Sequence, residues 1–558
     1  MGLVTPTEPV PLDELGRVHF VGIGGVGMSG IARIMAARGT KVSGSDSGAS
    51  PALDELTALG VRVHVGHAAE QVGDADTLVV SSAIRDSNPE LAEARRRGLR
   101  VLHRAAALAS LMTGRRVIAV TGTHGKTTTT SMIATALLET GTGPAYAIGG
   151  LLAATGTGAA DGPGRDFVAE ADESDGSFLM YAPDVAVVTN IEADHLDNYG
   201  TEQAYRASFG KFLARIKPGG LLVTSADDPG TQVLIDRARA LGLRVVTFGE
   251  SPDADYRVTR ATTSGMETML TIRREPASPA AAEAGHALDE GDEPPSTHRG
   301  PRDSAPADNS GRRASAAAAG ATGSGADGAT EPVAGRSKPE SFGSSAFDLR
   351  IGVPGHHNAL NAAAAFAAVV ELGTEPRRAA EALASYRGAA RRLEPKGEAR
   401  GVRVLDTYAH HPTELAADLR TALEITGRAI AGDKSTGGTG RVIAVFQPHL
   451  YSRTRIFAAG FGAALGLADE VVVLDVYGAR EDPEPGVTGR LVADAVPGGA
   501  AHYVPEFADV PKVVAALAAP GDLVLTMGAG DITRMGPLLL AEIADPGAGS
   551  RSPGAGRR

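Results

Sequence analysis

The sequence predicts an α/β protein with three domains, and three observations support that fold class. The chain has 558 residues, which at about 100–200 residues per domain allows three or four domains. Short apolar strands alternate with helical patterns in three stretches of the chain, as they do in parallel sheets with right-handed crossovers. In the first two stretches a glycine-rich turn follows a strand and opens a helix, which is typical of doubly wound folds.

The composition excludes several classes of site. The chain has no cysteine, so disulfides, thiolate catalysis and cysteine-ligated metals are impossible. Lys and Arg number 54 against 66 Asp and Glu, a net charge of −12, which argues against a nucleic-acid partner and against an anionic membrane. No signal peptide is visible, and no apolar run approaches the roughly 18 residues that span a bilayer. We therefore expect a cytoplasmic protein without membrane insertion, and its oligomeric state stays open.

The first domain is predicted over residues 14–113 as a Rossmann-like fold. The turn Gly22-Ile23-Gly24-Gly25-Val26-Gly27 imitates the dinucleotide fingerprint, and Asp46 lies 24 residues after Gly22. This turn favours a nicotinamide cofactor or a nucleotide-diphosphate substrate, and a tight strand–helix packing turn explains it equally well. Strands are expected at residues 17–21, 41–43, 61–65 and 77–80, with a helix at 28–38.

The second domain is predicted over residues 114–389, with a phosphate-binding loop near its start. A buried strand at 115–120 runs into Thr121-Gly122-Thr123-His124-Gly125-Lys126-Thr127, and a helix is expected at 128–139. Glycines let backbone N–H groups turn towards phosphate oxygens, and the helix N-terminus adds positive potential. Lys126 can reach the terminal phosphates, and the Thr127 hydroxyl can bind Mg²⁺. An incidental glycine-rich turn is the weaker interpretation, because strand, glycines, Lys-Thr and helix coincide in the required order.

Two acidic loops follow further strands of this domain, expected at residues 167–169 and 184–189. The first loop starts at Glu170, and the second contains Glu192, Asp194 and His195. Parallel strands bring ligand-binding loops to the edge where their carboxyl ends meet. A carboxylate and an imidazole can therefore converge there on a Mg²⁺–triphosphate. A solvated acidic loop is the alternative for either loop alone, and the pair beside a phosphate loop favours metal binding.

Residues 277–340 differ from the rest of the second domain. Leu288 and Val333 are their only large aliphatic residues, and aromatic residues are absent. Such a segment cannot bury enough apolar surface to offset its ordering entropy, so we predict disorder. Strands expected at 266–272 and 347–353 flank it, which indicates an insertion within one domain. The tail at 545–558 is likewise predicted to be disordered.

The third domain is predicted over residues 390–544 as another Rossmann-like fold, with strands at 402–405, 442–446, 470–474 and 523–526.

The glycine loops and the acidic loops are compatible with two classes of enzyme. An NAD-dependent dehydrogenase would use the first glycine loop and leave the phosphate loop and the acidic loops without a role. An ATP-driven enzyme acting on a nucleotide-diphosphate substrate would use both glycine loops, and it accounts for more of the sequence.

Nine motifs occur in the order seen in the Mur ligases, and the chain resembles that family over about residues 17–540. The resemblance implies a three-domain Mur ligase architecture, with a UDP-sugar domain, a P-loop ATP domain and a C-terminal amino-acid domain. It implies ATP-dependent ligation of L-alanine to the lactyl carboxylate of UDP-N-acetylmuramate through an acyl phosphate, in peptidoglycan precursor synthesis. Addition of a preformed peptide to the same sugar is the alternative within the family. The motifs are GIGGVGMSG, TGTHGKTTTT, EADESD, NIEADHLD, GHHNALN, ARR, YAHHPTE, FQPHLYSRTR and TMGAGDI.

The resemblance also implies roles for individual residues. Catalytic roles fall to Lys126, Glu170, His195, Arg392 and His410. The residues that match ATP positions are Gly122, Thr123, His124, Gly125, Lys126, Thr127, Thr128, His357, Asn358, Asn361, Arg392 and Asp406. Those that match Mg²⁺ positions are Thr127, Glu170 and His195. The UDP-sugar is expected at Gly24, Gly25, Val26, Gly27, Asp46 and Ser82, and alanine at Tyr408, His410 and Arg453.

The chain departs from the family pattern at two places. The family commonly reads Asp-Asp-Tyr-Gly-His-His, and here the run is Asp406-Thr407-Tyr408-Ala409-His410-His411. The position after His449 is often Arg in relatives, and here it is Leu450. One cation for the alanine carboxylate is therefore missing, and Arg453 or Arg455 would have to supply it.

The implied chemistry sets further expectations. A triphosphate, a carboxylate and a UDP repel one another strongly in a cleft of low dielectric constant, so Lys126, Arg392 and magnesium must offset that charge. The alanine amine must be neutral when it attacks, and His410 is either its base or positioning group or a structural histidine. An acyl phosphate must be kept from water, so we expect domain closure with hinges near residues 112–115 and 388–392.

Overall fold

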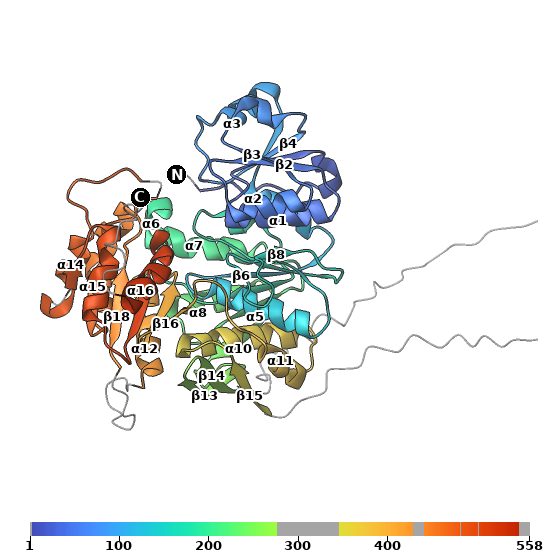
Figure 1. The fold of residues 1–558 in the computed structure, drawn as a ribbon. Coiled ribbons are helices and arrows are strands. Elements are labelled where there is room, and N and C mark those ends of the chain that lie inside the picture. Colours follow the sequence, from blue (N-terminus) through green and yellow to red (C-terminus); the bar gives the residue numbers. More distant parts are fainter. Residues whose placement is uncertain (1–2, 276–344, 428–439, 480, 500, 546–558) are drawn as a thin grey trace, which may run out of the picture. The chain divides into compact units, whose positions relative to one another are not determined.

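The computed structural model describes residues 3–275, 345–427, 440–479, 481–499 and 501–545. Their strands form three sheets of five, ten and six strands, which follow one another from blue through green to orange in Figure 1. The predicted α/β fold class is confirmed. In the part of the chain that is described, no helix is long and apolar enough to cross a membrane. Short 3₁₀ helices lie at Leu12–Leu15, Ala69–Val72, Ser177–Met180, Pro497–Gly499, Phe507–Asp509 and Asp531–Arg534.

The first sheet is parallel, with the strand order β3-β2-β1-β4-β5. The four predicted strands are present, and β5 is an edge strand that the sequence analysis missed. Asp46 is the last residue of β2, three residues beyond the predicted end of that strand. The strands are β1 (Val18–Val21), β2 (Val42–Asp46), β3 (Arg62–Val65), β4 (Thr77–Val80) and β5 (Arg100–His103). The helices are α1 (Val26–Ala37), α2 (Pro51–Ala58), α3 (Pro89–Arg97) and α4 (Arg104–Met112).

The second sheet has the order β15-β14-β13-β12-β11-β10-β6-β9-β7-β8. β6 lies between β9 and β10 and is parallel to both, so the phosphate loop and the two acidic loops leave the sheet at the same edge. The strands are β6 (Arg116–Thr121), β7 (Ala145–Ala147), β8 (Ala159–Ala160), β9 (Asp166–Glu170), β10 (Val185–Val188), β11 (Leu221–Ser225), β12 (Arg244–Gly249), β13 (Tyr256–Ser264), β14 (Glu267–Arg274) and β15 (Ser345–Ile351). The helices are α5 (Lys126–Glu139), α6 (Leu196–Tyr199), α7 (Glu202–Leu213), α8 (Pro229–Ala240), α10 (His356–Glu371) and α11 (Pro376–Leu383).

Both edges of the second sheet are antiparallel: β7 pairs with β8 at one edge, and β13, β14 and β15 pair at the other. β13 and β14 form a hairpin in which Ser264 lies opposite Glu267, and Gly265 supplies the positive φ, 58°, that such a tight turn needs. β14 pairs in turn with β15, with Arg274 opposite Ser345. Residues 276–344 therefore join two neighbouring strands of one sheet. The disorder predicted for residues 277–340 and for the tail lies outside the described residues.

We expect a chain that lacks residues 280–340 to keep its ATP-dependent activity and its thermal stability. The ends of β14 and β15 are paired already, and residues 275–279 and 341–344 would remain to connect them. Hairpin loops need only about 2–5 residues. Thermal unfolding and phosphate release, compared with the full chain, check this expectation. A clear fall in either would show that the segment contributes to the folded or active state.

The third sheet has the order β16-β17-β21-β18-β19-β20, and only the edge strand β16 is antiparallel to its neighbour. Each sheet draws its strands from one predicted domain; the exact domain limits stay a prediction. The strands are β16 (Glu394–Ala399), β17 (Val402–Thr407), β18 (Val442–Phe446), β19 (Glu470–Val473), β20 (Ala501–Tyr503) and β21 (Leu523–Met527). The helices are α12 (Pro412–Ile425), α13 (Tyr451–Leu465), α14 (Arg490–Ala495), α15 (Val510–Leu517) and α16 (Met535–Ala544).

The central strand β6 is fixed by apolar packing on both of its faces. Val117 and Ala119 face a core that includes Phe209 of α7. Ile118 and Val120 face a second core with α5 and α10. Because α10 is built largely from buried alanines, it can approach α5 closely. Burial of both faces explains why β6 reads as a continuous apolar run and why the loop that follows it has a rigid base.

Candidate active site

The phosphate loop lies between β6 and α5. Gly122 has a φ of 125° and Gly125 a φ of 82°, values that strongly favour glycine. A Cβ at Gly125 would also collide with the side-chain amide of Asn361 on α10. α5 begins at Lys126, two residues earlier than predicted. The N–H groups of its first turn are therefore available to an anion seated in the loop.

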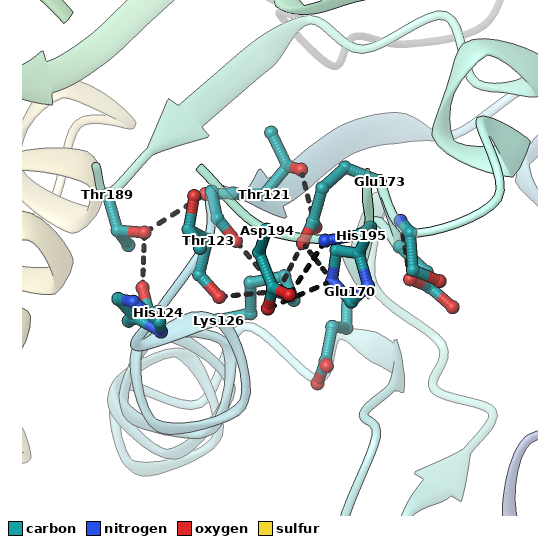
Figure 2. A network of polar contacts seen from close by, with 12 residues as sticks. Thr121, Thr123, His124, Lys126, Glu170, Glu173, Thr189, Asp194 and His195 are labelled. Atoms are coloured by element: carbon teal, nitrogen blue, oxygen red, sulfur yellow. Dashed lines mark hydrogen bonds and ion pairs between the residues drawn. The ribbon is translucent and has the colours of Figure 1, made fainter. Parts of the chain in front are cut away.

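Lys126 is held by the loop and by a buried carboxylate, as Figure 2 shows. Its Nζ donates hydrogen bonds to the carbonyl oxygens of Gly122 at 2.7 Å and Thr123 at 3.0 Å, and to Oε1 of Glu173 at 2.8 Å. Glu173 is fully buried. Burial by itself lowers the pKa of Lys126, but the negative charge of Glu173 outweighs it and the pKa is raised. The loop thus carries a permanent ammonium group.

Thr127 and Glu170 offer oxygen ligands of the kind that Mg²⁺ prefers. Thr127 Oγ1 donates a hydrogen bond to Glu170 Oε1 at 3.1 Å, and the other oxygen of Glu170 accepts from the N–H of Gly149 at 2.7 Å. Adjacent ligands of an octahedral Mg²⁺ lie about 3 Å apart, because each metal–oxygen bond is about 2.1 Å long. These two side chains therefore fit a hard cation beside the phosphate loop.

His195, the third predicted metal ligand, lies among other carboxylates. Its Nε2 is 3.5 Å from Oε1 of Glu173 and 3.5 Å from Oδ2 of Asp194. Asp194 in turn accepts a hydrogen bond at 3.1 Å from Nη2 of Arg453, and both of those side chains are buried. Burial lowers the pKa of His195, yet Glu173 and Asp194 raise it overall. The contact between Asp194 and Arg453 joins the second acidic loop to α13.

A cavity of about 370 Å³ lies beside the phosphate loop. Its walls combine the predicted adenine-side motif with the phosphate loop and with Arg392. Three apolar residues of the second domain, Pro229, Phe248 and Leu360, form part of the lining and suit a flat base. The predicted ATP residues at this cavity are His124, Gly125, Thr128, His357, Asn358, Asn361 and Arg392.

Asp406, a further predicted ATP residue, is not part of the cavity lining. It is fully buried, and its carboxylate accepts hydrogen bonds from Thr526 Oγ1 at 2.7 Å and from Nε of Arg391 at 3.3 Å. Its neighbour Thr407 faces the cavity instead. Alternation along β17 puts successive side chains on opposite sides of the strand, so only one of the two can face the cavity.

His124 connects the phosphate loop to α12 of the third domain. Its Nε2 lies 3.1 Å from Glu192 and its Nδ1 lies 3.3 Å from Glu414. Thr413, also on α12, donates a hydrogen bond from Oγ1 to Glu192 at 2.7 Å. Burial lowers the pKa of His124, but the hydrogen bonds that its ring donates to the two carboxylates raise it to about 9. A protonated imidazole therefore bridges two acids that belong to different domains.

Arg392 contacts the metal-binding side of the loop, because its Nη2 donates to Thr127 Oγ1 at 3.3 Å. The residues on either side of it, Arg391 and Leu393, have φ values of 60° and 51°. Such left-handed conformations are costly for non-glycine residues. The strain lies within the segment where we predict a hinge, and it directs Arg392 towards the phosphate loop.

The residues predicted near alanine are Tyr408, His410 and Arg453 of the third domain. His410 Nδ1 is 2.9 Å from the carbonyl oxygen of Tyr408; a carbonyl only accepts, so Nδ1 carries the hydrogen and Nε2 keeps its lone pair. Burial, reinforced by Arg453, lowers the pKa of His410 to about 3. Of the two cations proposed to replace the missing arginine at Leu450, Arg453 is buried, whereas Arg455 is exposed and pairs with Glu484.

The predicted UDP-sugar residues fall into two groups. Asp46 Oδ2 accepts a hydrogen bond at 2.9 Å from the N–H of Gly24, so the carboxylate lies against the first glycine loop. Gly25, Val26 and Gly27 complete this turn at the start of α1. Ser82 lies elsewhere and donates to Asp175 of the first acidic loop at 2.7 Å. The structure thus ties one predicted sugar residue directly to the loop that follows β9.

The sequence analysis did not single out several charged residues of this site. Arg104 donates to Asp172 at 2.7 Å, and its guanidinium lies near the Gly27 turn. Arg104 follows β5 directly, so recognising that strand would have pointed to it. Glu173 lies inside a motif that was recognised, but nothing in the sequence distinguishes it from its acidic neighbours. Glu414 reaches the site only through the packing of the third domain on the second.

Three family models match the chain. They are described as the Mur ligase family catalytic domain at residues 17–116, the Mur ligase middle domain at 120–278, and the Mur ligase glutamate ligase domain at 391–530. Relatives named UDP-N-acetylmuramate–L-alanine ligase include one from Thermobifida fusca (strain YX), 50% identical over 97% of this chain and 99% of its own. Another, from Kineococcus radiotolerans, is 50% identical over 95% of this chain and 97% of its own.

Solved structures are similar over nearly the whole chain. A UDP-N-acetylmuramate–alanine ligase from Thermotoga maritima has a TM-score of 0.68 at 27% identity, covering 94% of this chain and 98% of its own. A murein peptide ligase from Psychrobacter arcticus shares the fold, with a TM-score of 0.62 at 21% identity, over 95% of this chain and 99% of its own. From the three matched models and the full-length relatives we conclude that the chain belongs to the Mur ligase family.

Proposed function

We propose that the protein is an ATP-dependent ligase that joins L-alanine to the lactyl carboxylate of UDP-N-acetylmuramate. The observation that carries this proposal is the match, at 50% identity over 97% of the chain, to a relative named for that reaction. The geometry supports it, because a lysine, a carboxylate and an arginine meet at the phosphate loop. ATP and nucleotide-activated sugars are cytoplasmic substrates, so we propose the cytoplasm as the place of the reaction.

The first step transfers the γ-phosphoryl group. A lactyl carboxylate oxygen attacks the γ-phosphorus, the bond to the bridging oxygen breaks, and ADP leaves with that electron pair. Lys126 and Arg392 place two positive charges next to the loop and offset the charge on the transferred group. Thr127 and Glu170 would hold Mg²⁺, which when bound neutralises phosphate charge.

The second step forms the amide. The neutral amine of alanine attacks the acyl carbon, the acyl–phosphate bond breaks, and the released inorganic phosphate takes up the proton that the amine loses. Nε2 of His410 has a lone pair that can accept a hydrogen bond from the amine and so orient it. With a pKa of about 3, this imidazole stays neutral at physiological pH. We therefore assign His410 as a positioning group for the amine rather than as a strong base.

The two alternatives from the sequence receive less support. A dehydrogenase would leave the cavity beside the phosphate loop without a role, and the chain belongs to a family of ligases. A peptide-adding ligase shares the fold, but the full-length relatives at about half identity are named for alanine. Alanine is therefore the nucleophile we propose, in preference to a peptide.

The direct test is phosphate release with ATP, Mg²⁺ and UDP-N-acetylmuramate, scanned across L-alanine, L-serine, glycine and an alanine-containing tripeptide. We expect L-alanine to give the highest kcat/KM and the tripeptide to give no product. Preference for the tripeptide would favour the peptide-adding alternative. Release that does not depend on UDP-N-acetylmuramate would contradict the proposal.

Glu170→Gln is expected to raise the Mg²⁺ concentration needed for half-maximal activity by about tenfold or more, because an amide is a poorer ligand than a carboxylate for a hard cation. Titration of Mg²⁺ at fixed ATP measures the shift. Glu139→Gln, at the exposed end of α5, is the matched control and should leave the titration unchanged. Identical Mg²⁺ curves for Glu170→Gln and the unmodified protein would rule out this role for Glu170.

A further inference from the structure

Asp418 of α12 is a buried carboxylate in the lining of the cavity beside the phosphate loop. Its Oδ2 accepts a hydrogen bond at 2.5 Å from Thr407 Oγ1. Its Oδ1 lies 3.7 Å from Nε2 of His357, too far for a hydrogen bond. Among the residues that the structure describes, Thr407 is the one hydrogen-bond donor to Asp418. One oxygen of this buried acid therefore lacks a donor.

Burial outweighs the positive charge of Arg392 and the hydrogen bond from Thr407 at Asp418. Burial, together with the nearby carboxylate of Glu414, raises the pKa of Asp418 to about 7. His357 cannot compensate, because burial and the neighbouring cations lower its own pKa to about 4 and leave it neutral. Arg392 lines the same cavity but donates to Thr127. The second oxygen of Asp418 is therefore available to a hydrogen-bond donor that enters the cavity.

The position of Asp418 along α12 suggests which part of a nucleotide provides it. Glu414, one helical turn earlier, contacts His124 of the phosphate loop at 3.3 Å, and one turn of helix is about 5.4 Å. Asp418 thus lies about one sugar ring beyond the phosphates, while the apolar part of the lining, Phe248 and Leu360, suits the base. Vicinal ribose hydroxyls are donors that a carboxylate accepts well.

The sequence adds an independent observation. Position 407 is Thr where the family motif commonly has a second Asp, and this side chain faces the cavity. The Thr407 hydroxyl now holds a carboxylate that comes from α12 instead of from β17.

We propose that Asp418 binds ATP by accepting hydrogen bonds from the ribose hydroxyls, with Thr407 holding its second oxygen in place. This inference rests on the proposed function, since ATP must occupy the cavity. It assigns to this chain a nucleotide contact that lies outside the recognised motifs.

The test compares ATP with 2′-deoxy-ATP and 3′-deoxy-ATP in alanine-dependent phosphate release by the full-length protein. The unmodified protein is expected to favour ATP over at least one deoxynucleotide by about tenfold or more in kcat/KM, the range for a hydrogen bond to a charged group. In Asp418→Asn this preference should fall towards unity, because only the efficiency with ATP declines. The paired substitution T407D/D418T, which returns the carboxylate to the strand, should restore most of the preference.

Controls separate a ribose contact from a structural role. Asp494→Asn, an exposed acid of α14, should leave the nucleotide preference unchanged. An unmodified protein that uses both deoxynucleotides as well as ATP would overturn the inference without any variant. So would an Asp418→Asn protein that loses efficiency equally with all three nucleotides. Failure of the proposed function itself would look different, since the unmodified protein would then release no phosphate with ATP.

Discussion

Lys126→Ala is expected to lower alanine-dependent phosphate release by about a thousandfold or more, in the range seen when a preorganised charge that stabilises a transition state is removed. Nζ of Lys126 donates its three hydrogens to two loop carbonyls and to Glu173, so the ammonium group is held at the loop and exchanges one of these partners for the γ-phosphate. Removing it also leaves the buried Glu173 without its nearest cation. The γ-phosphate would then face a carboxylate with no ammonium group between them.

Two comparisons make this experiment specific. Lys211→Ala removes an exposed lysine from α7 and should leave activity unchanged. Thermal unfolding of Lys126→Ala shows whether the uncompensated Glu173 harms the fold, and Lys126→Ala/Glu173→Gln removes both charges together. If the folded single variant kept most of its activity, Lys126 would not act on the phosphoryl group.

The bridge between His124, Glu192 and Glu414 predicts a loss of stability as the pH rises from 6.5 to 9. The pKa of His124 is raised from 6.5 to about 9 in the folded chain. A group with a raised pKa contributes its full stabilisation below pH 6.5, and that contribution is lost as the pH passes the folded value. The shift corresponds to about 3 kcal/mol. Glu192, whose pKa is lowered to about 2, stays ionised throughout this window.

We expect His124→Gln to remove this pH dependence. Chemical denaturation at pH 6.5 and pH 9.5 measures the free energy of unfolding, and the unmodified protein should lose about 3 kcal/mol more than the variant over that interval. His502→Gln, on the edge strand β20, should behave like the unmodified protein. Parallel curves for the unmodified and His124→Gln proteins would mean that the imidazole is not held as a cation between the two acids.

Local sequence patterns were sufficient to predict the centre of the fold. β6, β9 and β10 are short apolar runs that end in a glycine loop or an acidic loop, and each of these features depends on neighbours in the sequence. Strand β13 and the edge strand β16 were missed because few of their side chains are buried and neither strand is a continuous apolar run. Such strands form because they pair with a neighbouring strand. A continuous apolar run predicts a buried parallel strand, but it does not predict an antiparallel strand with exposed side chains.

The residues of the site also divide into those that local sequence predicted and those that only the folded chain brings together. The glycine loop, Lys126, Thr127 and Glu170 lie next to one another at one sheet edge, as the order of strand and loop predicted. Asp406 was matched by motif, yet the alternation of β17 turns it into the core and presents Thr407 to the cavity. Glu414 and Asp418 lie on a helix of the third domain. Their approach to the phosphate loop depends on contacts between residues more than 200 positions apart, which no local pattern encodes.

Isotope transfer tests most directly whether the γ-phosphoryl group passes through the sugar carboxylate. UDP-N-acetylmuramate labelled with ¹⁸O in its lactyl carboxylate is converted with ATP and L-alanine, and the released phosphate is analysed by mass spectrometry. An acyl-phosphate route transfers one labelled oxygen from the carboxylate to each phosphate. Phosphate without label would show that water or another group accepts the phosphoryl group, and would contradict the proposed reaction.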